Sequence, residues 1–267
     1  MKKKIKLLPS FNFRHMFAAP LIIFLIMLVV LPMILLLWHA FSGNDGFTFE
    51  YFVTFAGDRP AQIILLRSIG IAFLSTFICI IIAYPIAYGL TMAGFKRGQT
   101  ILVLFILPLW INILLRSFAL SQLFLLIGLQ QGLTQLVAAM VIDLLPFMIL
   151  PIYIVLSNIN KHYIEASQDL GARPHQVFLK TVLPLSIPGI LSGFVLVFSA
   201  TVSAFFQAEM FGNNRTRMFG QIIDDFFEFR NLGPGAVHSL VVLVIVLACM
   251  IITNRFSKIG NKKGGLW

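Results

Sequence analysis

The sequence predicts an all-α fold in which six helices cross a membrane. Of its 267 residues, 59% are hydrophobic and 11% are charged, whereas a soluble domain carries about 25% charged residues. The apolar residues are gathered into long runs, and a helix needs about 20 of them to cross roughly 30 Å of hydrocarbon. We therefore expect residues 1–267 to form a single transmembrane domain with several spans.

The first apolar run covers residues 17–39 and follows a basic start that includes Lys2, Lys3 and Arg14. A cleaved signal peptide has a shorter apolar core, of about 7–15 residues, and a small-x-small cleavage motif. This run is longer and has no clear Ala-x-Ala motif. It is therefore expected to be a retained membrane span.

Five further spans are expected at residues 64–93, 101–122, 135–156, 185–207 and 236–254. A short turn at residues 94–98 separates the second span from the third. Several prolines fall inside the expected spans, where neighbouring helices or water can satisfy the carbonyls that proline leaves without a donor. These prolines are Pro20, Pro32, Pro85, Pro108, Pro146 and Pro151.

The distribution of charge predicts that both termini lie in the cytoplasm. This orientation places 14 of the 20 Lys and Arg residues inside, in agreement with the positive-inside rule, and the opposite orientation places six there. The inside set is Lys2, Lys3, Lys4, Lys6, Arg14, Lys96, Arg97, Lys161, Arg173, Lys180, Arg255, Lys258, Lys262 and Lys263. The net charge of +10 then reflects orientation in a membrane, and no nucleic-acid partner is expected.

A polar segment, residues 161–184, lies between the fourth and fifth expected spans and reads KHYIEASQDLGARPHQVFLKTVLP. The pattern predicts two short helices. Asn160 can cap the first, Gly171 can take the positive φ that ends it, and Pro174 suits the first turn of the second. The charge distribution places this segment in the cytoplasm. It forms either a docking surface or a connector that lies on the membrane.

Sequence motifs for catalysis or cofactor binding are missing. There is no G-x-x-x-x-G-K-[ST] phosphate-binding loop, so we do not expect this chain to bind or hydrolyse ATP. Cys79 and Cys249 lie in apolar runs, which argues against a disulfide framework. The five histidines are scattered, and we expect no metal site, no catalytic residue and no bound cofactor.

The spacing Glu165-Ala166-Ser167-x-x-x-Gly171, followed by Leu183-Pro184, resembles the "EAA" cytoplasmic loop of bacterial ABC importer permeases. Other segments extend the likeness to permeases of spermidine/putrescine importers, most similar to the first of their two permease subunits. These segments are RSI at 67–69, AYPIAY at 83–88, LPLWIN at 107–112 with Arg116, and LLPFMILP at 144–151. The resemblance covers about residues 20–255. Ser167 replaces the third residue of Glu-Ala-Ala, and Thr181 stands where Ile is usual.

The resemblance implies a type I ABC importer permease fold in the bacterial inner membrane. It also implies a second permease subunit, two cytoplasmic ATPases that use ATP and Mg²⁺, and an external substrate-binding protein. Residues 157–184 would form the loop that couples this chain to the ATPases, with Gly171 making the turn. The residues expected to carry the coupling are Glu165, Ala166, Ser167, Gly171, Val177, Phe178, Leu183 and Pro184.

Polyamines are polycations, so their path should present carboxylates or aromatic faces. Asp143 is the one carboxylate inside an expected span, and it serves either the path or a structural pair with Arg116 or with a polar group of the partner permease. The other candidates belong to the expected outer segment 208–234, where a solvated surface is the alternative. They are Glu209, Asp224, Asp225 and Glu228.

Three other functions compete with polyamine import. A related permease could carry another small solute, such as iron, thiamine or an opine-type ligand. A stand-alone secondary transporter or channel usually needs several ionisable residues within its spans, and here Asp143 is nearly alone. A membrane enzyme needs a nucleophile with a base or a metal site, and the sequence has neither spacing.

Overall fold

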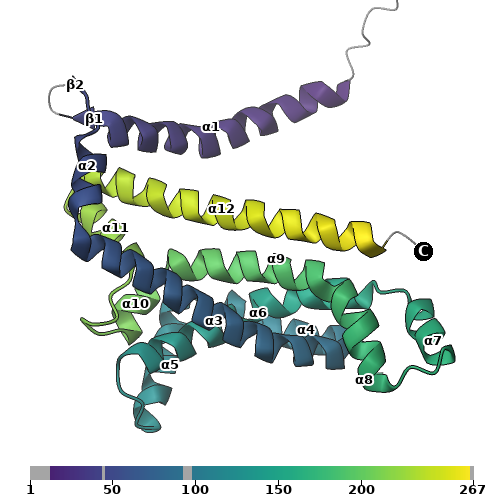
Figure 1. Ribbon diagram of the computed structural model, residues 1–267. Helices are drawn as coiled ribbons and strands as arrows, with labels where there is room; N and C mark the ends of the chain where they lie inside the picture. Colours follow the sequence, from purple (N-terminus) through teal and green to yellow (C-terminus); the bar gives the residue numbers. More distant parts are fainter. Residues whose placement is uncertain (1–12, 44–45, 93–97, 265–267) are drawn as a thin grey trace, which may run out of the picture.

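The computed structural model describes residues 13–43, 46–92 and 98–264, and these residues form long helices that run side by side (Figure 1). The expected turn at 94–98 and the basic residues Lys2–Lys6, Lys96 and Arg97 fall outside the described residues, apart from Gly98. The elements in chain order are α1 (Phe13–Phe41), β1 (Ser42–Gly43), β2 (Gly46–Phe47), α2 (Glu50–Gly57), α3 (Arg59–Met92), α4 (Gly98–Ile106), η1 (Leu107–Trp110), α5 (Ile113–Leu126), α6 (Leu133–Ser157), α7 (Lys161–Asp169), α8 (Pro174–Val177), η2 (Phe178–Val182), α9 (Leu183–Val202), α10 (Phe206–Phe211), α11 (Phe219–Glu228) and α12 (Leu232–Gly264).

Within these ranges, five helical runs are long and apolar enough to cross a membrane. They correspond to the first, second, fourth, fifth and sixth expected spans, which confirms those spans as helices. The run that corresponds to the fifth expected span extends over residues 174–202, so it begins earlier and ends earlier than the expected 185–207. α1 begins and α12 ends at the same end of the bundle as α7 and α8, whereas α2, α10 and α11 lie at the opposite end (Figure 1).

The third span, expected as one helix over residues 101–122, is broken. Gly98–Trp110 and Ile113–Leu126 meet at an angle of 99°. Pro108 lies at the break, and proline interrupts a helix because it has no N–H and its ring displaces the preceding turn. Ile111 is extended, and the Asn112 side chain accepts a hydrogen bond from the Leu114 N–H at 2.8 Å, which starts α5 in a new direction.

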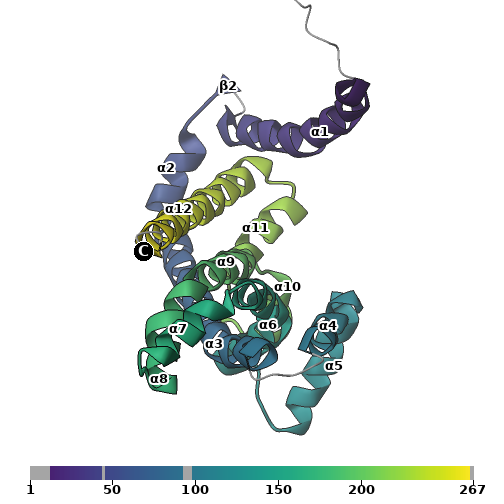
Figure 2. The same ribbon diagram turned by 90° about the vertical axis from the view of Figure 1, so that its right-hand side faces the viewer.

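The core consists of α3, α6 and α9, which pack closely against one another. Small residues permit the close approach. A Cβ atom added to Gly189 of α9 would lie 2.9 Å from the Pro151 carbonyl oxygen and 3.1 Å from the Ile152 Cα of α6, and membrane helices use glycine in this way to bring backbones together. α12 covers the other side of α9, and α1 joins the bundle through α12 (Figure 2). The two polar regions of the chain therefore lie at opposite ends of one helical bundle.

Candidate functional site

The segment between α6 and α9, residues 157–184, is called the coupling loop below. Its local structure agrees with the sequence. Asn160 Oδ1 accepts the His162 N–H at 3.1 Å and caps α7. Gly171 has a φ of +79°, in the left-handed region that favours glycine, and α8 begins at Pro174. These three predictions are confirmed, while the role of the loop in coupling stays a prediction.

The side chains of the coupling loop divide into an outward and an inward set. Leu170, at the end of α7, is 89% exposed, and Tyr163 is 58% exposed. Glu165 and Ala166 are exposed as well, and Glu165 lies 3.1 Å from the His162 ring nitrogen. An exposed leucine and tyrosine beside charged residues form a surface suited to contact with a partner.

The expected contact residues Val177 and Phe178 belong to the inward set. Val177 is 5% exposed, and Phe178 packs on the base of α3. These two residues, which were expected among those that carry the coupling, therefore contact the membrane-spanning helices of this chain. α9 begins at Leu183, two residues before the expected span at 185–207. Leu183 and Pro184 do not interrupt the helix direction, because α8 continues into α9 through the π-helical turn η2.

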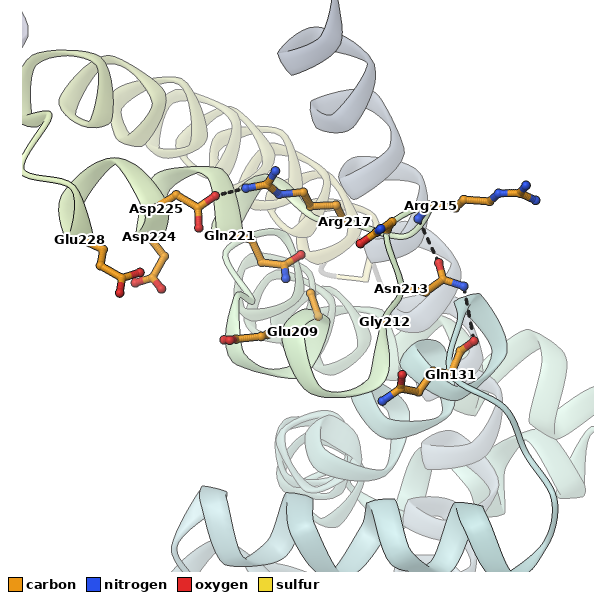
Figure 3. A pocket seen from close by; sticks show the side chains of 12 residues that line it. Gln131, Glu209, Gly212, Asn213, Arg215, Arg217, Gln221, Asp224, Asp225 and Glu228 are labelled. Carbon is orange, nitrogen blue, oxygen red and sulfur yellow. Dashed lines mark hydrogen bonds and ion pairs between the residues drawn. The ribbon is translucent and has the colours of Figure 1, made fainter.

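A polar cavity of about 820 Å³ lies at the opposite end of the bundle (Figure 3). It brings together four of the five carboxylates that the sequence singled out. α10 supplies Glu209, and one face of α11 supplies Asp224, Asp225 and Glu228. We call it the acidic cavity, and its lining residues are Gln131, Ala208, Glu209, Gly212, Asn213, Asn214, Arg215, Arg217, Gln221, Asp224, Asp225 and Glu228.

The carboxylates of the acidic cavity differ in their pairing. Arg217 forms an ion pair with Asp225, and both side chains are partly exposed. Among the described residues, Glu209, Asp224 and Glu228 have no such partner, and the last two point to the same side of α11 (Figure 3). The Arg215 side chain is directed away from them (Figure 3). The cavity therefore presents excess negative charge to whatever enters it.

The wall of the acidic cavity is fixed by contacts that sequence patterns did not reveal. The buried Ser68 hydroxyl of α3 accepts the Phe219 N–H at 2.8 Å and holds the start of α11. Asn213 donates to the Gln131 carbonyl at 3.4 Å and links the segment before α11 to the start of α6. The polar composition of residues 208–234 was a signal for Asn213 and Arg217, but nothing near Gln131 or Ser68 marked them as part of this wall.

Asp143, the fifth candidate carboxylate, does not line the acidic cavity. It lies within α6 and is 3% exposed. Its Oδ1 accepts a hydrogen bond from Arg116 Nε of α5 at 2.8 Å, and Arg116 also donates to the Pro108 carbonyl at 3.0 Å. The pair thus ties α6 to both sides of the break in the third span.

No three His, Cys, Asp or Glu side chains gather to hold a metal ion within the part of the chain that the structure describes. Cys79 is buried, Cys249 is partly buried, and both are free thiols.

Comparisons with known proteins agree with the fold. The sequence profile of the family "Binding-protein-dependent transport system inner membrane component" matches residues 77–259. The spermidine/putrescine transport system permease protein PotB of Salmonella typhimurium strain LT2 is 27% identical over 94% of this chain and 96% of its own length. PotB of Haemophilus influenzae is 28% identical over the same shares.

A solved bacterial alginate ABC transporter, in complex with its alginate-bound periplasmic protein, contains a chain with the same fold. The TM-score is 0.69, with 16% identity over 91% of this chain and 93% of that chain. At this identity the likeness concerns the fold alone. It agrees with the type I importer architecture that the sequence predicts.

Proposed function

Since this chain belongs to the family of binding-protein-dependent transport system inner membrane components, we propose that it carries polyamines across the inner membrane. Family membership makes the chain a multi-pass membrane subunit of an ABC importer, which is a channel component and not an enzyme. The choice of cargo is our proposal. Two observations support it. The similar PotB proteins of Salmonella typhimurium and Haemophilus influenzae are named as spermidine/putrescine permeases, and the acidic cavity presents carboxylates that suit a cation.

The acidic cavity is the observation that carries the proposal. Aliphatic amines resemble the lysine side chain, with a pKa of about 10.4, so a polyamine bears a positive charge on each nitrogen at neutral pH. Glu209, Asp224 and Glu228 offer several carboxylates along one wall, which suits a linear polycation better than a single charge. A volume of about 820 Å³ falls in the range of roughly 300–1,000 Å³ that is usual for small-molecule sites.

The coupling loop supports a cytoplasmic ATPase as the partner. Its outward set, Tyr163, Glu165 and Leu170, presents apolar and charged groups on one short helix and its end. Phosphate-binding motifs are missing from the sequence, so ATP and Mg²⁺ would bind to the partner. A complete importer would contain two such ATPases, a second permease subunit and an external binding protein.

The exposed apolar surface of α1 suits contact with lipid.

The proposed orientation puts the coupling loop inside the cell and the acidic cavity outside. Single cysteines at Gln168 and Asn214, in a chain whose Cys79 and Cys249 are replaced by serine, test it with a membrane-impermeant maleimide. We expect the cysteine at Asn214 to react in intact cells and the one at Gln168 to react after lysis. Labelling of Gln168 and not of Asn214 in intact cells would reverse the topology and place the cavity inside.

The proposed cargo is tested with the assembled importer. The chain should co-purify with a P-loop ATPase and a second permease. When this complex is reconstituted in proteoliposomes together with the binding protein, the rate of ATP hydrolysis should rise on addition of putrescine or spermidine. Thiamine and ferric iron serve as comparison solutes. If thiamine or ferric iron stimulates ATP hydrolysis and is taken up, and neither polyamine does so, the polyamine assignment is rejected while the assignment as an importer subunit stays.

A further inference from the structure

The coupling loop contacts α3 through Phe178, a residue outside the Glu165–Gly171 motif. We propose that Tyr84 and Tyr88 of α3, with Phe178 of η2, form an aromatic clamp that makes α3 move together with the loop. This inference rests on the proposed role of the loop in coupling to an ATPase. It assigns Tyr84, Tyr88 and Phe178 as positioning residues for transport.

The geometry of the clamp is that of two edge-to-face contacts on one ring. The Phe178 ring lies 5.8 Å from the Tyr84 ring at an interplanar angle of 80°, and 5.3 Å from the Tyr88 ring at 90°. Tyr84 and Tyr88 are four residues apart on α3, so they share one helix face and both contact the Phe178 ring. Aromatic pairs favour such perpendicular arrangements, which fix both position and orientation.

A buried hydrogen bond extends the clamp to α9. The Tyr84 hydroxyl lies 2.9 Å from Ser186 Oγ, and Ser186 donates its own proton to the Leu183 carbonyl at 2.9 Å. The Tyr84 hydroxyl is therefore the donor to Ser186. Tyr84 is 8% exposed and Ser186 is fully buried, so the bond is shielded from water. Tyr84 thus contacts the chain both within η2, through Phe178, and just after it, through Ser186.

On its other side, η2 is fastened to α7. Ser167 gives its proton to the Tyr163 carbonyl at 2.7 Å, and its oxygen lies 3.0 Å from the Thr181 hydroxyl, which is then the donor. α7 packs on α8 and η2. Movement of α7 is therefore passed to η2, and from η2 to α9 by chain continuity and to α3 by the clamp.

The π-helical turn makes this junction a suitable place for movement. η2 spans five residues, Phe178–Val182, within an otherwise α-helical run, and single π turns often mark functional sites. Beside it lies a cavity of about 400 Å³, lined in part by Tyr88, Glu165 and Val182. The loop thus has space beside it, while the clamp restricts how far it can shift relative to α3.

Substitution of Phe178 by leucine tests the clamp, because it keeps apolar volume and removes both ring contacts. Phe194→Leu is the matched control, since Phe194 of α9 also contacts aromatic rings, Phe73 of α3 and Phe198, but lies away from the loop. In proteoliposomes we expect Phe178→Leu to lower the number of spermidine molecules imported per ATP hydrolysed by fivefold or more. Phe178→Tyr should restore that ratio, and Phe194→Leu should change it less than twofold.

A second measurement needs no cargo. Spin labels at Gln168 of α7 and Ile82 of α3, in the cysteine-free chain within the ATPase complex, report the distance between loop and α3. We expect ATP to leave this distance unchanged in the wild type and to change or broaden it in Phe178→Leu. An ATP-dependent change of equal size in the wild type would overturn the clamp.

The outcomes separate the clamp from the proposed function. A wild-type importer that does not carry spermidine rejects the cargo, and the distance measurement then still tests the clamp. An unchanged import ratio in Phe178→Leu, or an equal loss in Phe194→Leu, rejects the clamp and leaves the cargo in place. Loss of ATPase co-purification in Phe178→Leu would also reject it, because Phe178 would then belong to the docking surface.

Discussion

Carboxylates occupy two regions of this protein with opposite surroundings. Asp143 is buried within α6 and bonded to Arg116, which also holds the Pro108 carbonyl at the break of the third span. Glu209, Asp224 and Glu228 are exposed on the wall of the acidic cavity and lack an ion-pair partner among the described residues. A buried and paired carboxylate stabilises a helix arrangement, whereas exposed and unpaired ones are available to a cationic cargo.

The largest expected effect is a loss of stability on substitution of the buried carboxylate, Asp143. Asp143→Asn removes the negative charge that is paired with Arg116, and breaking one side of a buried ion pair costs about 3–5 kcal/mol. We expect a lower yield of the assembled complex and a lower melting temperature. Glu228→Gln, the matched control at an exposed carboxylate, should keep wild-type yield.

The pairing itself is tested by the double variant Asp143→Asn with Arg116→Gln. Removal of the unpaired arginine should restore part of the yield that Asp143→Asn loses. Wild-type yield in Asp143→Asn alone, together with reduced spermidine uptake, would place Asp143 on the cargo path instead.

A smaller effect is expected from neutralising one carboxylate of the acidic cavity at a time. Glu209→Gln, Asp224→Asn and Glu228→Gln should each raise the KM for spermidine uptake by about 1.5- to 5-fold, since an exposed charge pair contributes about 0.2–1 kcal/mol. The differences should shrink at 1 M salt, where charges are screened beyond about 3 Å. A KM that is unchanged at low salt in all three variants would remove these side chains from the binding of cargo.

The smallest effect concerns the one carboxylate of the acidic cavity that is paired. Arg217→Gln frees Asp225 and removes a positive charge, so the KM for spermidine should fall by about 1.5-fold, at the lower end of the range for exposed pairs, because both side chains are partly exposed. Arg215→Gln is the control, because its side chain is directed away from the carboxylates. An equal fall in both variants would indicate a general charge effect and not a specific pair.

The sequence predicts a region well when the structure of that region depends on residues that are close together along the chain. The coupling loop depends on neighbours along the chain, so Asn160, Gly171 and Pro174 could be assigned their places from spacing alone. The broken third span was missed, because Pro108 within an apolar run is compatible with a kink as well as with a break. Its geometry depends on Asn112 and on the distant Asp143, through Arg116.

The acidic cavity shows the same limit. Its acids were identified because Asp224, Asp225 and Glu228 fall on one helical turn. The rest of the wall depends on contacts between distant segments. Gln131 is 82 residues away from its partner Asn213, and Ser68, which holds the start of α11, is 151 residues away from Phe219. No local pattern contains that information.

The most direct test of the account is the KM for spermidine uptake in a triple variant, Glu209→Gln with Asp224→Asn and Glu228→Gln, reconstituted with its ATPase, second permease and binding protein. If the acidic cavity receives the cargo, the KM should rise by about 3- to 125-fold, which is the product of three single effects of about 1.5- to 5-fold, with a complex yield equal to that of the wild type. A wild-type KM in the triple variant would contradict the claim that the acidic cavity receives a cationic cargo.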